Sequence, residues 1–122
     1  MILFLDDETD ITDIYSKLMK RKYGFEVDAY NSPIAALEAV KKFPRRYDVI
    51  IADFKMPEMD GLKFSQKVRE NDITAKIMIC TGDPELISEK AAYDAKLFSV
   101  LKKPLKTDDM AAKINAARRE VP

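Results

Sequence analysis

Apolar residues along the chain gather into five short runs, separated by longer stretches in which they recur every three or four positions. The runs are candidate strands, at residues 2–5, 25–30, 47–53, 76–81 and 97–102. Three of them are apolar without alternation, which is typical of strands that are buried on both faces. The segment at residues 25–30 alternates and is expected at a sheet edge. The pattern therefore predicts five strands in alternation with five helices.

The first predicted helix has the clearest apolar face. Its members follow the spacing of one helix side: Ile11, Ile14, Tyr15, Leu18 and Met19. Thr9 or Asp10 is expected to cap its start, and Gly24 to close its end.

The other helices are placed by local end signals. Ser32 followed by Pro33 is an N-cap with a proline in the first turn, and Pro44 lies beyond the end of that helix. A third helix is expected from Gly61 to about Glu70, with Leu62, Ser65 and Val68 facing inward, and a fourth from Pro84 to about Tyr93. The last begins at Thr107, with Asp108 and Asp109 in its first turn, and its inward residues are Met110, Ile114 and Ala117.

Strict alternation of strands and helices predicts a parallel sheet with right-handed crossovers and helices on both faces, a doubly wound α/β sandwich. In such folds ligands bind beyond the carboxyl ends of the strands. The residues that end each strand are therefore the candidates for chemistry.

Chemically capable residues follow four of the five strands. They are Asp6-Asp7 with Glu8, then Asp53, then Thr81-Gly82, and finally Lys102-Lys103. The second strand ends in Tyr30-Asn31 and offers nothing comparable. We expect three carboxylates, a hydroxyl and an ammonium at one edge of the sheet.

Crowded carboxylates raise one another's pKa unless a cation intervenes. With oxygen ligands alone the cation should be hard, Mg²⁺ or Mn²⁺ in its place. One carboxylate could then attack phosphorus and form an aspartyl phosphate, while the lysine and the hydroxyl stabilise the transferred group. An EF-hand loop starting at Asp6 is excluded, because its sixth and twelfth positions hold Ile11 and Lys17.

Composition narrows the class of protein further. The 122 residues suit one domain, residues 1–122, and the 21 basic and 21 acidic residues argue against a basic nucleic-acid module. Neither a membrane-inserted segment nor a signal peptide is expected, since acids follow at once in MILFLDDE. The single cysteine, Cys80, suggests the reducing cytoplasm. The chain has no histidine, so catalysis would have to rest on carboxylates, lysines and hydroxyls.

Four segments in order, ILFLDDE, DVIIADFKMPEMDG, IMICTG and LKKPL, resemble the receiver domain of two-component response regulators, in particular the single-domain chemotaxis type. The resemblance covers essentially the whole chain. It implies a flavodoxin-like sheet of order 2-1-3-4-5. It also implies a signalling domain, not a conventional enzyme, that takes a phosphoryl group from a histidine kinase or a histidine phosphotransfer protein, loses it by autodephosphorylation, and switches a protein-binding surface for a downstream target. A phosphorylation-dependent dimer is compatible with this.

The resemblance assigns roles by position. Asp53 is the implied phospho-acceptor. The implied metal ligands are Asp7 directly, Asp6 mainly through water, Asp53, and the backbone carbonyl of Lys55; the implied phosphoryl-binding groups are Thr81, Gly82 and Lys103. The Lys103–Pro104 peptide is expected to be cis.

Two further regions follow from the resemblance. Lys55 and Asp83 occupy positions that tune the lifetime of the phosphate, and Lys55 is expected to shield it from water. Val100 stands where many receivers have a Tyr or Phe that rotates on activation, and valine is too short and too stiff for that movement. Phe98 is expected on the same face as Val100, one step away, and Lys96-Leu97 replaces the usual Gly-Ala. We therefore expect an output without an aromatic rotamer switch.

Two alternatives stay open from the sequence. A haloacid-dehalogenase-type phosphatase also uses an aspartate and Mg²⁺, but it places an Asp-x-Asp pattern on its first strand, where this chain has Asp6-Asp7-Glu8-Thr9. A degenerate receiver would act only as a binding module and would lack the acceptor or the lysine. The chain ends at Pro122, soon after the last predicted helix, so either it acts alone or it was cut from a longer protein.

Overall fold

The computed structural model describes residues 1–120 and contains one five-stranded parallel sheet in the order β2-β1-β3-β4-β5. The strands are β1 (Ile2–Leu5), β2 (Val27–Tyr30), β3 (Val49–Asp53), β4 (Lys76–Thr81) and β5 (Leu97–Lys102). The helices are α1 (Thr9–Tyr23), α2 (Pro33–Lys42), α3 (Gly61–Arg69), α4 (Glu89–Asp94) and α5 (Thr107–Arg119), with a 3₁₀ turn at Pro84–Leu86. The predicted flavodoxin-like fold and strand order are confirmed.

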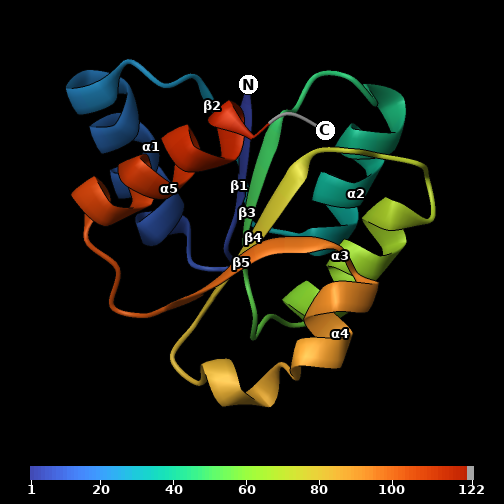
Figure 1. Cartoon of the computed structure of the whole chain (residues 1–122). Coiled ribbons are helices and arrows are strands. Elements are labelled where there is room, and N and C mark those ends of the chain that lie inside the picture. The colour runs from blue at the N-terminus through green and yellow to red at the C-terminus, as the bar shows by residue number, and fades with distance from the viewer. Residues whose placement is uncertain (121–122) are drawn as a thin grey trace.

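The sheet separates two layers of helices (Figure 1), with α1 and α5 on one side and α2, α3 and α4 on the other. Successive residues of each strand face opposite layers, so two cores form. The core under α1 and α5 includes Ile2, Phe4, Val49, Ile51, Met78, Cys80 and Leu101, and the core under α2 and α3 includes Leu3, Leu5, Ile50, Ala52, Ile77 and Phe64. Burial on both faces explains why the central strands are continuously apolar in sequence.

The prediction of one continuous helix from Pro84 to about Tyr93 is wrong. A 3₁₀ turn ends at Leu86, Ile87 is extended and buried, and α4 begins only at Glu89. The Ser88 hydroxyl accepts a hydrogen bond from the Ala91 N–H at 3.0 Å, which caps α4 at this point. Burying Ile87 and capping with Ser88 together outweigh the continuation of a single helix.

Several helix details also differ from expectation. Glu8, not Thr9 or Asp10, is the N-cap of α1, and Ile14 is 54% exposed instead of facing the core. Lys106, with no side-chain cap hydrogen bond, occupies the N-cap of α5 in place of Thr107. Gly24 ends α1 with a positive φ of 72°, as its sequence position predicts.

The expectation that Phe98 and Val100 share a face is also wrong. The pairing of β4 with β5 shifts register between Ile77 and Met78, so an irregularity lies opposite them in β5. Phe98 packs into the core under α1 and α5, whereas Val100 pairs with Ile79, whose strand neighbours Met78 and Cys80 face that same core. The extra residue of a bulge therefore places the two side chains on opposite sides of the sheet.

Candidate functional site

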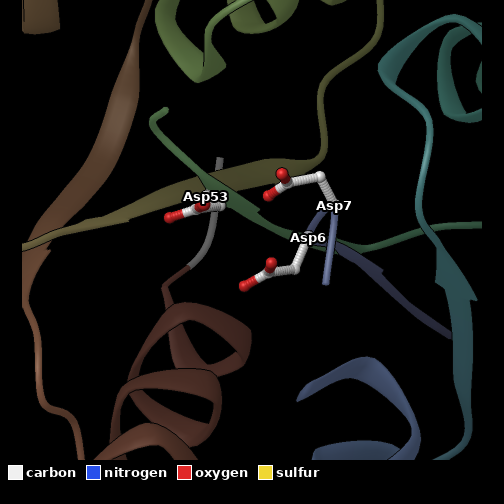
Figure 2. Close-up of side chains that lie close together, drawn as sticks. All are labelled: Asp6, Asp7 and Asp53. Carbon is white, nitrogen blue, oxygen red and sulfur yellow. The ribbon is translucent and has the colours of Figure 1, made fainter. Parts of the chain in front are cut away.

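Three carboxylates meet at the carboxyl edge of the sheet, where β1 and β3 end side by side. Asp6 and Asp7 follow β1 and Asp53 ends β3, and one oxygen from each lies within 4.8 Å of the others. Figure 2 shows the three side chains gathered at this edge. Asp6 is only 3% exposed, while Asp7 is open to solvent. The sequence prediction that strand ends bring these acids together is confirmed by their placement.

Lys103 supplies the cation of this cluster from the end of β5. Its Nζ lies 2.7 Å from Asp53 Oδ1 and 3.7 Å from Asp6 Oδ2. Burial alone would lower the pKa of Lys103, but the hydrogen bond to Asp53 and the charges of Asp53 and Asp6 raise that pKa above its usual value. The ammonium is therefore held in its charged form against the carboxylates. Lys102 points outward and is exposed.

The Asp6 carboxyl group has a raised pKa, because burial disfavours its charged form and the neighbouring Asp53 charge adds to this effect. The Glu8 N–H, which donates to Asp6 Oδ1 at 3.0 Å, and the Lys103 charge act in the opposite direction. The site thus holds more negative charge than Lys103 neutralises. Hard divalent cations favour such a set of oxygen ligands, so the residues present fit a Mg²⁺ ion.

Thr81 is buried at the end of β4, directly after Cys80, the residue that pairs with Asp53. Its hydroxyl oxygen accepts the Asp83 N–H at 3.1 Å, and its carbonyl accepts the Lys103 N–H at 2.8 Å. The hydroxyl proton makes no hydrogen bond within residues 1–120 and can be donated to a ligand. Gly82 follows in an exposed position.

The two positions expected to tune a phosphate lifetime contact each other. Lys55 Nζ lies 3.2 Å from Asp83 Oδ2, an ion pair that joins the loop after β3 to the loop after β4. Both side chains are largely exposed. The pair therefore links the loops that follow the strands ending in Asp53 and Thr81.

Gly61 is a site residue that the sequence reasoning did not single out by function. A Cβ built at this position would lie 2.3 Å from the Asp53 carbonyl oxygen, so only glycine allows the start of α3 to approach the end of β3 so closely. The Gly61 N–H also donates to the Phe54 carbonyl at 2.8 Å, and Asp60 caps α3 through Lys63 N–H at 2.7 Å. The sequence signal for this glycine is the Met-Asp-Gly segment, in which the helix cap Asp60 directly precedes Gly61.

Asn31 is a second residue that was missed, since the end of β2 was expected to offer nothing comparable. Its Nδ2 donates to the Asp6 carbonyl at 2.9 Å and to Thr12 Oγ1 at 2.9 Å. Asn31 therefore steadies the turn that presents Asp6, although it brings no charge to the site. The Lys103–Pro104 peptide bond is cis, as predicted.

A family model described as the response regulator receiver domain matches residues 2–115, so the chain belongs to that family. The response regulator receiver protein CpdR of Brucella abortus is 30% identical over 116 residues, which cover 93% of this chain and 92% of CpdR. The CpxR homolog of Haemophilus influenzae, a transcriptional regulatory protein, is 26% identical over 97% of this chain but only 50% of its own length. The chain thus spans about half the length of several curated relatives it matches.

Solved structures agree with this assignment. A response regulator receiver domain from Clostridium thermocellum has a TM-score of 0.85 at 27% identity, covering 95% of this chain and 91% of the other. The chemotaxis protein CheY4 of Vibrio cholerae has a TM-score of 0.82 at 26% identity, covering 95% and 96%. Among residues 1–120, no helix has the length and hydrophobicity that a membrane crossing requires.

Membership of the receiver-domain family defines the general role of this chain in signalling. This chain is a response regulator receiver domain of a two-component signalling system, a class of signalling modules that are not conventional enzymes. Receiver domains generally bind Mg²⁺ in an acidic pocket, and this chain has a cluster of acidic residues, Asp6, Asp7 and Asp53, at the corresponding end of its sheet. They act between histidine kinases and downstream effectors, and the beryllofluoride-activated NtrC4 receiver domain is a dimer.

Proposed function

We propose that Asp53 accepts a phosphoryl group from the phosphohistidine of a partner kinase or histidine phosphotransfer protein. The observation that carries this proposal is the placement of the Asp53 carboxylate 2.7 Å from Lys103 within the acidic cluster. In the reaction an Asp53 oxygen forms a bond to phosphorus, the nitrogen–phosphorus bond breaks, and the electron pair returns to the imidazole of the donor. The family match over residues 2–115 and the single sheet with its two cores support one receiver domain over residues 1–122.

The residues around Asp53 divide the work of binding the transferred group. Lys103 exchanges its contact with the carboxylate for one with a phosphoryl oxygen. Thr81, whose hydroxyl proton is free among the described residues, donates to another oxygen, and the N–H of Gly82 lies next in the chain. Asp6, Asp7, Asp53 and the carbonyl of Lys55 would hold Mg²⁺, or Mn²⁺, which neutralises negative charge on the carboxylates and on the phosphoryl oxygens.

The lifetime of the phosphate would depend on Lys55 and Asp83. Their ion pair joins the loops that follow β3 and β4, Lys55 lies two residues after Asp53, and the Lys55 side chain is long enough to reach a phosphoryl group. We infer that Lys55 slows hydrolysis by restricting the attacking water. Autodephosphorylation would then be slower with this pair than without it.

The output would run through the exposed surface next to β5. Val100 cannot swing between pocket and surface as an aromatic side chain does, and Phe98 is held in the core on the other face. The phosphorylated domain would therefore signal by loop and backbone adjustment, to a target protein or to a second copy, in the cytoplasm. Spectra of the two states by NMR test this, because large shifts confined to an aromatic ring packed on Val100 would contradict it.

Intact-mass measurement after incubation with Mg²⁺ and acetyl phosphate or phosphoramidate tests the proposal. We expect one base-labile phosphoryl group on the wild type and none on Asp53→Asn. The exposed carboxylate variant Asp13→Asn is the matched control and should be phosphorylated like the wild type. Turnover of many phosphate esters would instead favour a phosphatase, and failure to bind even beryllofluoride would favour a module that only binds partners.

A further inference from the structure

Positive charge is concentrated at the end of the molecule where the strands begin and the helices finish, opposite Asp53. We call this region the basic end. It comprises the last turn of α2 and the loop to β3, the start of β4, and the last turn of α5; its cations are Lys41, Lys42, Arg45, Arg46, Lys76, Arg118 and Arg119. In Figure 1 the loop from α2 to β3 and the end of α5 lie at the top, whereas the strands reach their carboxyl ends lower down. The basic end is thus remote from the candidate phosphorylation site.

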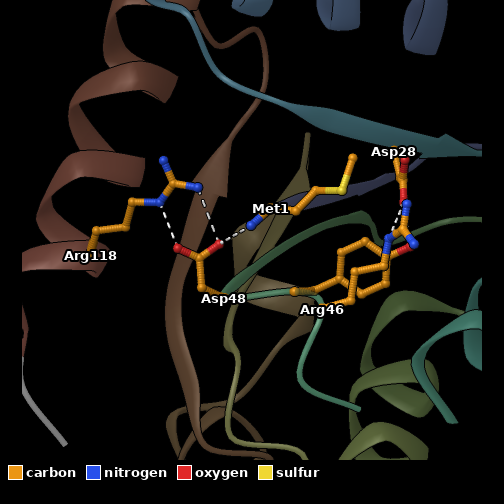
Figure 3. Close-up of polar contacts among 6 residues, drawn as sticks. Met1, Asp28, Arg46, Asp48 and Arg118 are labelled. Carbon is orange, nitrogen blue, oxygen red and sulfur yellow. Dashed lines mark hydrogen bonds and ion pairs between the residues drawn. The ribbon is translucent and has the colours of Figure 1, made fainter. Parts of the chain in front are cut away.

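Few of these cations are neutralised. Arg46 Nε lies 3.0 Å from Asp28, and Arg118 contacts Asp48 at 2.7 and 3.2 Å, as Figure 3 shows. The other five cations of the basic end form no ion pair within residues 1–120. Substituting them would therefore remove charge without breaking an internal ion pair.

The surface of the basic end is hollowed and contains one exposed aromatic side chain. Two adjoining hollows of about 360 and 480 Å³ share Pro44 and Arg45 in their walls. Phe43 lines the first hollow and is 44% exposed. The Lys42 Nζ and the Arg46 guanidinium lie 5.5 and 5.4 Å from the centre of its ring.

We propose that the basic end binds an anionic lipid surface, with the lysines and arginines on headgroup phosphates and Phe43 at the headgroup boundary. Each Lys or Arg near such a surface raises the partition coefficient by about fivefold. The acids at the Asp53 edge do not cancel this attraction. Strands of this length separate the two edges by roughly 15–20 Å, about twice the screening length of 8–10 Å at physiological salt.

The contacts of Phe43 favour a lipid surface over a nucleic acid. Base stacking needs an open ring face, whereas two cations already lie near this ring. A duplex or a folded RNA would also meet the acids of a chain whose net charge is zero. A flat anionic surface approaches the basic end, where Asp28 and Asp48 are paired with Arg46 and Arg118. It leaves Asp53 facing away from the membrane, open to a partner kinase.

Co-sedimentation with vesicles at about 0.1 M salt tests the proposal, using phosphatidylcholine vesicles with or without about one third phosphatidylglycerol. Wild-type protein should bind only the vesicles that contain phosphatidylglycerol. The double variant Lys42→Glu, Arg45→Glu should lose about tenfold or more in partition coefficient. The matched double variant Lys63→Glu, Lys106→Glu carries the same change of charge on exposed residues near the other edge, and it should bind like the wild type.

A third variant, Phe43→Ser, should weaken binding severalfold while the salt dependence stays, because it removes only apolar contact. Thermal melts and phosphorylation by acetyl phosphate establish that each variant is folded, and neither readout depends on lipid. Equal binding to neutral vesicles, no binding to either vesicle, or equal losses in both double variants would overturn the proposal. Tighter binding to single-stranded RNA than to vesicles at the same salt would also overturn it, in favour of a nucleic-acid surface.

Discussion

Replacing Gly61 with alanine tests the packing that positions the acceptor strand against α3. The added Cβ would lie 2.3 Å from the Asp53 carbonyl oxygen and 3.2 Å from both the Asp53 carbonyl carbon and Phe54 Cα. Real Cβ atoms essentially never come closer than 3.0 Å, so the two segments must separate by the difference, about 0.7 Å. All three contacts are with backbone atoms, and therefore no side-chain rotation can relieve them.

The expected cost follows from two opposing effects. Overpacking of a tight site costs about 1–3 kcal/mol, while exchanging glycine for alanine in a helix returns up to about 1 kcal/mol. The net loss of about 1–2 kcal/mol corresponds to a fall in Tm of roughly 3–10 °C for a chain of this length. Acetyl phosphate should also phosphorylate Gly61→Ala more slowly, because a shift of the Asp53 backbone misplaces the nucleophile.

Thermal melts and rates of phosphorylation measure both effects, and Gly82→Ala is the control for the melts alone. A Cβ at position 82 meets nothing within 4 Å, so this variant should melt within about 1 °C of the wild type, as surface substitutions do. If Gly61→Ala melts at or above the wild-type temperature, helix propensity outweighs the clash. The argument from close backbone approach would then be refuted.

Three further predictions concern the site. Lys55→Ala and Asp83→Ala should each speed loss of the phosphate by up to about fivefold, because an exposed ion pair changes an activation barrier by at most ~1 kcal/mol. Intact mass, recorded over time after removal of the phosphoryl donor, measures the decay, and an unchanged rate would mean that the pair does not affect hydrolysis. In the folded chain the pKa of Asp6 lies above its ordinary value of 3.8, so the free energy of unfolding falls as pH rises from 3.8 through that raised pKa. Asp6→Asn lacks this charge and should melt higher than the wild type at pH 7 in EDTA, with a flatter dependence of Tm on pH; an equal or lower Tm would contradict this. Burial raises the pKa of Cys80 to about 12 from 9.0, so iodoacetamide at pH 8 should react roughly a thousandfold faster after unfolding; similar rates would mean that the thiol is accessible.

The strands and the site acids could be predicted because burial and topology act on them together. A central strand of a parallel sheet is covered on both faces, so its sequence is a continuous apolar run, and the residue that ends it must lie at one edge. The same reasoning places Asp6, Asp53 and Lys103 together at that edge, as the structure has them. It failed for Asn31, whose contribution is two hydrogen bonds, to the Asp6 carbonyl and to Thr12 in α1, and not a charge at a strand end.

The segment after Thr81 shows what the sequence pattern leaves open. Apolar spacing from Pro84 to Tyr93 allows one helix. In the structure, however, Ile87 is buried and has an extended backbone, and it separates two shorter helical pieces. The choice depends on a pocket for Ile87 that exists only in the folded chain. Ser88 followed by Glu89 is a local start signal for α4 that the prediction did not use.

The bulge opposite Ile77 and Met78 is the other feature that periodicity cannot reveal. Strict alternation places Phe98 and Val100 on one face, and a single extra residue in β5 reverses that relation. The consequence bears on signalling, because the nearest aromatic side chain to Val100 in sequence is committed to the core under α1 and α5. No aromatic from β5 can therefore replace the missing one at position 100.

Opposite charges collect at the two edges of the sheet for one topological reason. In a parallel sheet every strand ends at the same edge, and every helix runs back to the other. Acids that follow strands gather near Asp53, while cations in the last helical turns, such as Lys42 and Arg118, return to the opposite edge, where the helix dipoles favour them. A net charge of zero conceals this separation, so the composition that excludes a uniformly basic module does not exclude a basic face. A phosphoryl group on Asp53 adds its charge beyond the screening length from that face, which leaves the basic end free to act in either state of the switch.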